Sequence, residues 1–153
     1  MPKRQPKAEA PPPLIPAKDA PPCLYLRLRL ASKRLLSLYE ERLAASGVSM
    51  SQFGLLAGIG EEPELTISRL AEKRELSPST LTRTLRPMEE AGWIEIFADP
   101  ENGRVRRLRL TREGRARLKT AYAGWRQAQA EAVEIVSPRD VERVLRATEK
   151  LPV

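Results

Sequence analysis

Hydroxyl and arginine side chains are concentrated in one short segment, residues 77–86, with the sequence Ser-Pro-Ser-Thr-Leu-Thr-Arg-Thr-Leu-Arg. Leu81, Leu85 and Met88 recur there at the spacing of a buried helix face, so the polar side chains belong to the exposed face. Short hydroxyls allow close approach to phosphates and base edges, and an arginine can donate two parallel hydrogen bonds to guanine. The side chains that we expect to contact nucleic acid are Ser77, Ser79, Thr80, Thr82, Arg83 and Arg86. We assign base contact to Arg83 and phosphate contact to Arg86, against the alternative that both arginines are merely solvated.

A second basic segment lies between Gly103 and Lys119, where eight Lys and Arg residues stand against Glu113 alone. This local excess of +7 (eight minus one) equals the formal net charge of the whole chain, +7. A charge run is often only a solvated face, but its place after the hydroxyl segment favours a polyanionic partner. Arginines here would neutralise phosphates or enter the minor groove, and affinity would fall as salt rises. We expect these contacts from Arg104, Arg106 and Arg107.

Two short helices and a hairpin would position these side chains. The sequence predicts a first helix over 66–73, a tight turn at 74–76 and a second helix over 78–91. A hairpin is predicted over 93–110. In this order of elements the second helix enters a DNA major groove and the hairpin contacts the neighbouring backbone, so we predict a winged helix-turn-helix over 49–111.

The predicted hairpin has two distinct faces. Its core face is formed by Ile94, Ile96, Leu108 and Leu110. The arginines would point outward, and Asp99 at the base of the turn would pair with Arg104 and orient the tip. Since an exposed ion pair contributes little stability, about 0.5 kcal/mol, orientation would be its only role.

Helical segments flank the winged unit on both sides, at 23–48 and 112–153. The alternation of leucines from Leu24 to Leu30 also fits a strand, but the length of the segment favours one long helix that stops before Gly47. Residues 49–52 form a capping-box pattern, Thr111 is a helix N-cap, and Ser137 starts the last helix. The fold class is therefore mainly α with a small β-hairpin wing (α+β).

The flanking helices carry apolar stripes although they lie at opposite ends of the chain. The economical solution packs them together and against a second copy, which gives a two-fold homodimer that contacts two half-sites of a palindrome in double-stranded DNA. By contrast, residues 1–22 hold eight of the fourteen prolines and almost no periodic apolar residues, so we predict a disordered basic tail.

Composition argues against catalysis and metal binding. The chain has no histidine and one cysteine, which removes the commonest general base, the commonest metal ligand and any internal disulfide. We therefore expect no enzyme activity, no metal and no cofactor. The apolar runs are too short to span a bilayer and the first residues lack the pattern of a secretory signal, so we expect no membrane association and a cytoplasmic location.

An ordered series of segments resembles the MarR family of bacterial winged-helix repressors over roughly residues 23–136. The matching segments are 34–43, 51–56, 66–71, 76–83, 85–94 and 110–115. The resemblance implies a homodimer built from the terminal helices, repression by operator binding, and release of DNA by a small aromatic or phenolic effector. Two positions depart from the family pattern. The wing has Asp99-Pro100-Glu101-Asn102-Gly103-Arg104 where Asp-x-Arg-Asp-x-Arg is common, and Glu75 stands where a glycine is frequent.

Cys23 is a candidate redox residue by the same resemblance. Peroxide-sensing members place a cysteine fourteen residues before a tyrosine, but Cys23 precedes Tyr39 by sixteen residues and Tyr25 occupies the sensing position. No histidine is present to activate the thiol. We expect an inert cysteine, with a thiol switch as the alternative.

Candidate effector contacts come from helices that should border the crevice between the dimer helices and the winged unit. An arginine beside aromatic side chains could hold an aromatic carboxylate. These candidates are Tyr25, Arg29, Arg34 and Trp125. The leading hypothesis is thus a dimeric, ligand-responsive MarR-type repressor, and the alternatives are a non-specific architectural DNA-binding protein and a redox sensor through Cys23.

Overall fold

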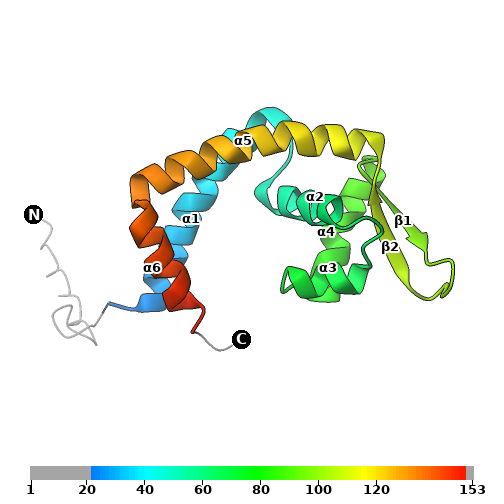
Figure 1. Cartoon of the computed structure of the whole chain (residues 1–153), viewed down its shortest axis with the longest axis horizontal. Helices are drawn as coiled ribbons and strands as arrows, with labels where there is room; N and C mark the ends of the chain where they lie inside the picture. The colour runs from blue at the N-terminus through cyan, green and yellow to red at the C-terminus, as the bar shows by residue number, and fades with distance from the viewer. Residues whose placement is uncertain (1–21, 151–153) are drawn as a thin grey trace, which may run out of the picture.

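The computed structural model describes residues 22–150 and shows a mainly helical chain with one two-stranded antiparallel sheet, as predicted (Figure 1). The first helix and the short 3-10 turn after it are α1 (Leu24–Leu43) and η1 (Ala44–Ser46). The winged unit consists of α2 (Met50–Glu61), α3 (Ile67–Lys73), α4 (Pro78–Glu90), β1 (Ile94–Ala98) and β2 (Arg106–Leu110). The chain then returns through α5 (Arg112–Val136) and α6 (Pro138–Thr148). The predicted disordered tail lies outside the described residues, apart from Pro22.

The helix boundaries follow local capping groups. Ser49 and Gln52 form the predicted capping box, with Ser49 Oγ accepting from the Gln52 amide at 3.2 Å and Gln52 Oε1 accepting from the Ser49 amide at 3.0 Å. Thr111 Oγ1 accepts from the Gly114 amide at 3.0 Å and caps α5. Ser137, which has a φ of 70°, separates α5 from α6 and caps α6. The segment from Leu24 to Leu30 is helical, which settles the ambiguity left by its alternating leucines.

The core of the winged unit lies between its three helices and the sheet. The side chains that are almost fully buried there include Leu56, Leu70, Leu81, Leu85, Met88 and Leu108. In the hairpin, Ile94 pairs with Leu110 and Ile96 with Leu108, so all four residues lie on the predicted core face. Leu65 accepts the Leu108 amide through its carbonyl at 2.8 Å, which joins the segment before α3 to the sheet.

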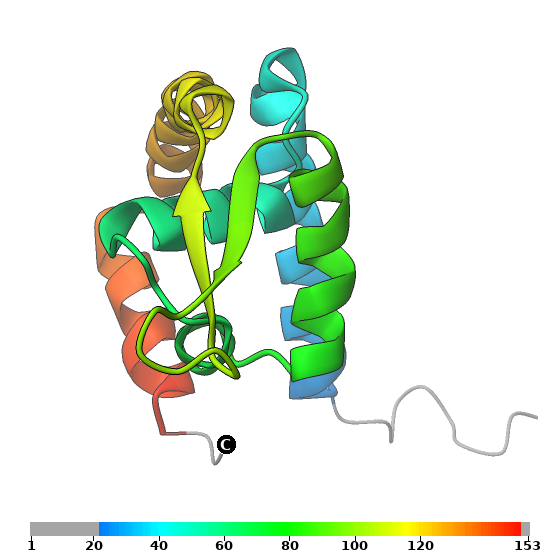
Figure 2. The same cartoon turned by 90° about the vertical axis from the view of Figure 1, so that its right-hand side faces the viewer.

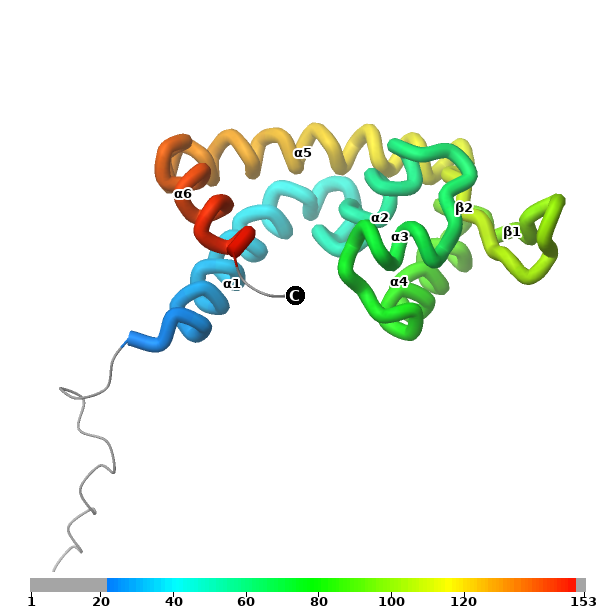
Figure 3. Tube along the Cα trace, turned by 60° about the horizontal axis from the view of Figure 1, so that its bottom comes forward, coloured from blue at the N-terminus to red at the C-terminus, as the bar shows by residue number. Residues whose placement is uncertain are grey.

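Helix α5 connects the winged unit to the remaining helices. Figure 3 shows α5 extending from the hairpin at one end to α6 at the other, with α1 packed beneath it. A Cβ added at Gly124 would lie 2.3 Å from the Arg42 carbonyl oxygen, so the backbones of α1 and α5 approach closely at this glycine. Arg42 donates to Glu131 at 2.8 and 3.0 Å, and Tyr39 donates to Gln129, which fixes the packing of α1 against α5.

Within residues 22–150, no single helix combines the length and the apolar composition needed to cross a membrane. Two consecutive helical segments, Leu24–Ser46 and Met50–Glu61, are long and apolar enough only when taken together, and the chain bends by 70° between them.

Candidate nucleic-acid interface

The helix-turn-helix forms through two hydroxyl caps and a left-handed turn residue. Thr66 Oγ1 accepts from the Arg69 amide at 3.2 Å at the start of α3, and Ser77 Oγ accepts from the Thr80 amide at 3.2 Å at the start of α4. Between the helices Glu75 has a φ of 50°. The turn therefore takes up a left-handed backbone conformation although no glycine is present, at some conformational cost.

Helix α4 has the two faces that its sequence predicts. Leu81, Leu85 and Met88 are buried, whereas Ser79, Thr82, Arg83 and Arg86 are exposed and Thr80 is half-buried. The hydroxyls also serve the helix itself, since Ser77 Oγ lies 3.0 Å from Ser79 Oγ and 2.9 Å from Thr80 Oγ1, and Thr82 donates to the Pro78 carbonyl at 2.8 Å. The helix continues through Pro87 without interruption.

The two arginines of α4 have different electrostatic surroundings. Arg86 Nε donates to Glu90 Oε1 at 2.8 Å, and this carboxylate raises the pKa of the Arg86 guanidinium. Arg83 forms no hydrogen bond or ion pair with any residue between 22 and 150, so its five donors are available to a ligand. Among the described residues, Arg83 is therefore the cation of α4 that no acidic side chain neutralises.

The wing corrects one prediction. Asp99 pairs with Arg107 instead of Arg104, and its side chain is only 7% exposed. Asp99 Oδ1 also accepts from the amides of Glu101 at 2.8 Å and Asn102 at 2.9 Å. The hydrogen bond from Arg107 and these two backbone bonds lower the pKa of the Asp99 carboxyl, so it is ionised at neutral pH.

Strand register explains the correction. Phe97 pairs with Arg107, and Asp99 lies two residues beyond Phe97 on the same face, which makes Asp99 and Arg107 diagonal neighbours. Arg104 lies in the turn beyond the last strand pair, Ala98 with Arg106. Period-two alternation counted forward from Phe97, together with the pairing of Phe97 with Arg107, is the signal that would have found the right partner.

Arg107 is consequently committed within the protein. Besides Asp99, its Nη1 donates to the Glu64 carbonyl at 3.0 Å, and the side chain is only 33% exposed. Arg107 is therefore half-buried and internally bonded instead of pointing fully outward, and its contact with DNA stays a prediction. Arg104 and Arg106 are exposed and, among the described residues, their guanidinium groups make no ion pair.

Part of the predicted positive charge is neutralised by acidic partners. Arg109 donates to both carboxylate oxygens of Glu95 at 2.9 Å and stacks 4.9 Å from the centroid of the Phe97 ring, and Arg117 pairs with Glu113. Within residues 22–150, the cations of this segment without an acidic partner are Arg104, Arg106, Arg112, Arg115 and Lys119.

The elements that we expect to contact DNA lie on one side of the molecule. In Figure 2, which views the hairpin end, the hairpin tip, α3 and the first turn of α4 all lie on the side opposite α5. A single duplex can therefore contact α4 and the exposed wing arginines together.

The predicted effector residues lie on α1 and α5, and none of them lines the apolar cavity described below. Tyr25 is 70% exposed on α1, where Arg29 and Arg34 are also exposed, whereas Trp125 is half-buried and stacks on Phe53 and Tyr122 with centroids 5.7 Å apart in each pair. A cavity of about 640 Å³ lies instead between the end of α2, β2 and α5. Its apolar side includes Ile59, Leu110 and Leu118, and its polar rim includes Arg115, Lys119 and Tyr122.

The sequence did not single out this cavity because its residues come from three separated segments. The spacing of Arg115, Lys119 and Tyr122 on one helix face is the only sequence signal for it. Cys23 is an exposed free thiol immediately before α1. In the described part of the chain, no three His, Cys, Asp or Glu side chains lie close enough together to hold a metal ion.

Comparisons with known proteins agree with this geometry. Residues 48–105 match the model of the MarR family. The HTH-type transcriptional repressor Rv2887 of Mycobacterium tuberculosis is 29% identical over 133 residues, which cover 87% of this chain and 95% of that protein. The structure of the M. tuberculosis transcriptional regulator MosR in complex with DNA is 33% identical, with a TM-score of 0.71 and coverage of 84% of this chain and 99% of that one.

A mutant MarR from E. coli complexed with operator DNA has the same fold, with a TM-score of 0.78 at 21% identity and coverage of 84% and 94% of the two chains. The family model, the sequence identity to MosR over nearly its whole length and the winged helix-turn-helix all agree. We conclude that the chain belongs to the MarR family of winged-helix transcriptional regulators.

Proposed function

We propose that this protein is a homodimeric repressor that binds a palindromic operator in double-stranded DNA. The observation that carries the proposal is the exposed guanidinium of Arg83 on α4, which has no hydrogen-bond or ion-pair partner among residues 22–150. The first turn of α4 lies on the same side of the molecule as the hairpin tip (Figure 2). Arg83 would contact a base in the major groove, and Ser79, Thr82 and Arg86 would contact phosphates. Arg104 and Arg106 of the wing would add phosphate or minor-groove contacts. The DNA complexes of MosR and MarR support this assignment by similarity.

Exposed apolar side chains on the terminal helices support the homodimer. Leu24, Leu26, Leu30 and Leu36 of α1 are 47–65% exposed, and Ile135 and Leu145 are 71% and 57% exposed. Large apolar side chains exposed on several helices are typical of an interaction site, and a second copy would cover them with the same helices. The proposal places the protein with chromosomal DNA in the cytoplasm.

Relief by a small molecule belongs to the same proposal. The cavity between α2, β2 and α5 combines an apolar wall with Arg115, Lys119 and Tyr122, which suits an aromatic acid or a phenolate. An effector there would contact both the sheet of the winged unit and α5.

Selection of binding sites from a random double-stranded library tests the proposal. We expect enrichment of one inverted repeat, protected on both half-sites in footprinting, with two chains bound per duplex. Equal binding to all duplexes would instead support the non-specific alternative. Loss of DNA binding on peroxide treatment of the wild type, but not of Cys23→Ser, would support the redox alternative.

A further inference from the structure

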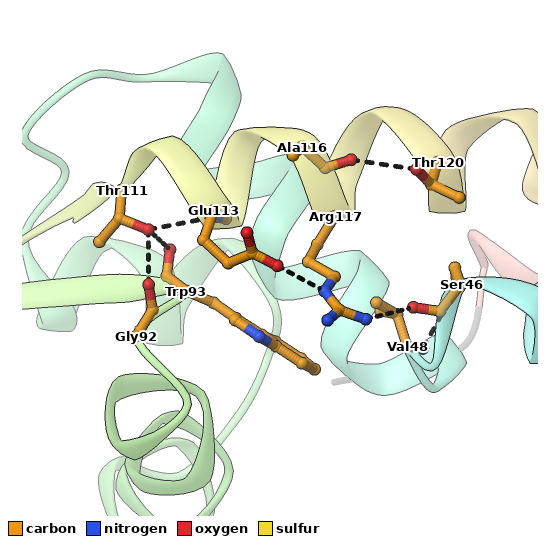
Figure 4. A network of polar contacts seen from close by, with 10 residues as sticks. Ser46, Val48, Gly92, Trp93, Thr111, Glu113, Ala116, Arg117 and Thr120 are labelled. Atoms are coloured by element: carbon orange, nitrogen blue, oxygen red, sulfur yellow. Dashed lines mark hydrogen bonds and ion pairs between the residues drawn. The ribbon is translucent and has the colours of Figure 1, made fainter.

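Arg117 on α5 makes contacts with three elements at once. Its Nε donates to Glu113 Oε1 at 2.9 Å within α5, and its Nη1 donates to the Ser46 carbonyl oxygen at 3.1 Å (Figure 4). Its Cζ lies 5.5 Å from the centroid of the Trp93 ring, within the range of a cation–π contact. Arg117 therefore joins the base of α5 to η1 and to the start of the hairpin.

Ser46 is a fixed point at the junction of α1 and α2. Its side chain is buried at 5% exposure, and its Oγ donates to the Leu43 carbonyl at 2.6 Å and accepts from the Val48 amide at 3.2 Å. The hydroxyl thus joins the last turn of α1 to the segment that precedes α2. The Ser46 carbonyl therefore keeps a fixed position relative to α1.

Trp93 lies just beyond α4, the proposed recognition helix, and is held by backbone hydrogen bonds. Its amide donates to the Met88 carbonyl at 2.9 Å, and its own carbonyl accepts from the Thr111 amide at 3.1 Å. Gly114 allows this carbonyl to lie against α5, since a Cβ there would be 1.8 Å from the Trp93 oxygen. The indole position is therefore coupled to the end of α4.

The Glu113 pair alone cannot explain these contacts. Arg146 and Glu142 on α6 form an ion pair with the same four-residue spacing, but among the described residues Arg146 contacts no other element by hydrogen bond or ion pair. What distinguishes Arg117 is the simultaneous use of two nitrogens and of the guanidinium face. A lysine would keep the charge but could not provide this planar set of contacts.

We propose that Arg117 is a positioning residue that fixes the recognition helix relative to α1 and so sets the spacing of half-sites that the dimer accepts. This inference rests on the proposed function, because half-site spacing has meaning only for a dimer on a palindrome. Arg117 itself touches neither bases nor phosphates in this assignment.

Operators with identical half-sites and a centre-to-centre spacing altered by one or two base pairs test the inference. Binding is measured by fluorescence anisotropy at one salt concentration for the wild type, Arg117→Ala, Arg117→Lys and the matched control Arg146→Ala. We expect the wild type and the control to prefer one spacing by about tenfold or more. In both Arg117 variants the preference should fall to about threefold or less, with affinity for an isolated half-site within about twofold of the wild type.

Sedimentation and thermal melting establish that each variant is folded and has the same oligomeric state, and Arg117→Lys decides the matter where Arg117→Ala does not fold. Retention of the wild-type spacing preference by the Arg117 variants overturns the inference. A loss of affinity that is equal at all spacings also overturns the inference. So does a spacing preference that Arg117→Lys restores, because either result would mean that Arg117 acts through its charge alone. If the wild type itself binds no palindrome, the proposed function fails, and this inference fails with it.

Discussion

Among single residues, Arg83 and Arg86 lie on one helix face but differ in whether an acidic side chain neutralises them. Both are exposed on α4, but Glu90 holds the Arg86 guanidinium, whereas Arg83 has no acidic partner among the described residues. A guanidinium without an internal partner loses less when it binds a base, because no existing hydrogen bond has to be broken.

Arg83→Ala should therefore weaken binding to the selected operator by about 1–3 kcal/mol and relax the base preference at one position of each half-site. Arg86→Ala is the matched control and should weaken binding to all sequences by a smaller and similar amount. Competition of labelled operator with unrelated duplex at fixed salt measures both effects. An equal loss on operator and unrelated DNA for Arg83→Ala would contradict base contact.

Asp99 shows how a carboxylate can organise the wing without touching DNA. Its pKa is lowered by Arg107 and by the Asn102 and Glu101 amides, so the folded state binds this proton more weakly than the unfolded chain. Stabilisation from the ionised form is therefore complete at neutral pH. It is lost as the pH falls through the ordinary aspartate value of about 4 and then through the lower folded value.

Asp99→Asn should lower the melting temperature at pH 7, and the difference from the wild type should shrink as the pH falls to about 3. Glu101→Gln is the control, because among the described residues the Glu101 carboxylate has no hydrogen-bond partner and only its amide is used. The measurement is thermal denaturation across this pH range. A difference between wild type and Asp99→Asn that stays constant with pH would contradict the assigned role of the charge.

The sequence predicted the surroundings of a side chain correctly where they depend only on residues nearby in the chain. The buried face of α4 followed from the spacing of Leu81, Leu85 and Met88, since an amphipathic helix needs only one period. The partner of Asp99 depends on strand register, and charge proximity in the sequence suggested the wrong arginine.

Among the elements, the hairpin and α5 meet at a close approach of two backbone segments. Thr111 caps α5 and donates to the Gly92 carbonyl at 2.6 Å, and the Trp93 carbonyl lies directly against Gly114. A side chain at position 114 would separate β1 from the first turn of α5.

Gly114→Ala should destabilise the protein by about 2 kcal/mol, because backbone atoms must move to relieve the overlap. Gly54→Ala is the matched control in α2, where the added Cβ meets no described atom within 4 Å apart from the adjacent backbone of its own helix. That change should stabilise the protein by up to about 1 kcal/mol through helix propensity. Denaturant unfolding of both variants measures the two effects, and a neutral Gly114→Ala would show that the junction is less tightly packed than described.

The helix ends were predictable because a cap is a local interaction. Ser49, Thr66, Ser77 and Thr111 each accept an amide three residues later, as their sequences indicate. The contacts of Arg117 and the walls of the cavity were not predictable, because they join positions separated by about seventy residues in the first case and by three chain segments in the second.

For the whole molecule, the exposed apolar side chains of the terminal helices predict how two copies would associate. Leu30 on α1 and Leu145 on α6 are 50% and 57% exposed in the single chain. If a second copy covers them, a charge at these positions would have to be buried without a partner.

The double variant Leu30→Glu with Leu145→Glu should be monomeric in sedimentation experiments and should bind the full operator at least about a hundredfold more weakly, because linkage of the two half-sites is lost. Ser68→Glu, which adds a charge on α3 outside the terminal helices, should stay dimeric. A dimeric double variant would show that other surfaces form the interface.

Helix α5 is a single uninterrupted rod of 25 residues from the wing to α6, about 37 Å long at 1.5 Å per residue. A tilt of about 5° about one end displaces the other by about 3 Å, close to the rise of one base pair along DNA. In the proposed dimer, a small displacement at the α6 end of α5 would therefore become a larger displacement of the wing on the duplex. The same stiffness would make the alignment of each winged unit in its groove sensitive to how the two copies pack together.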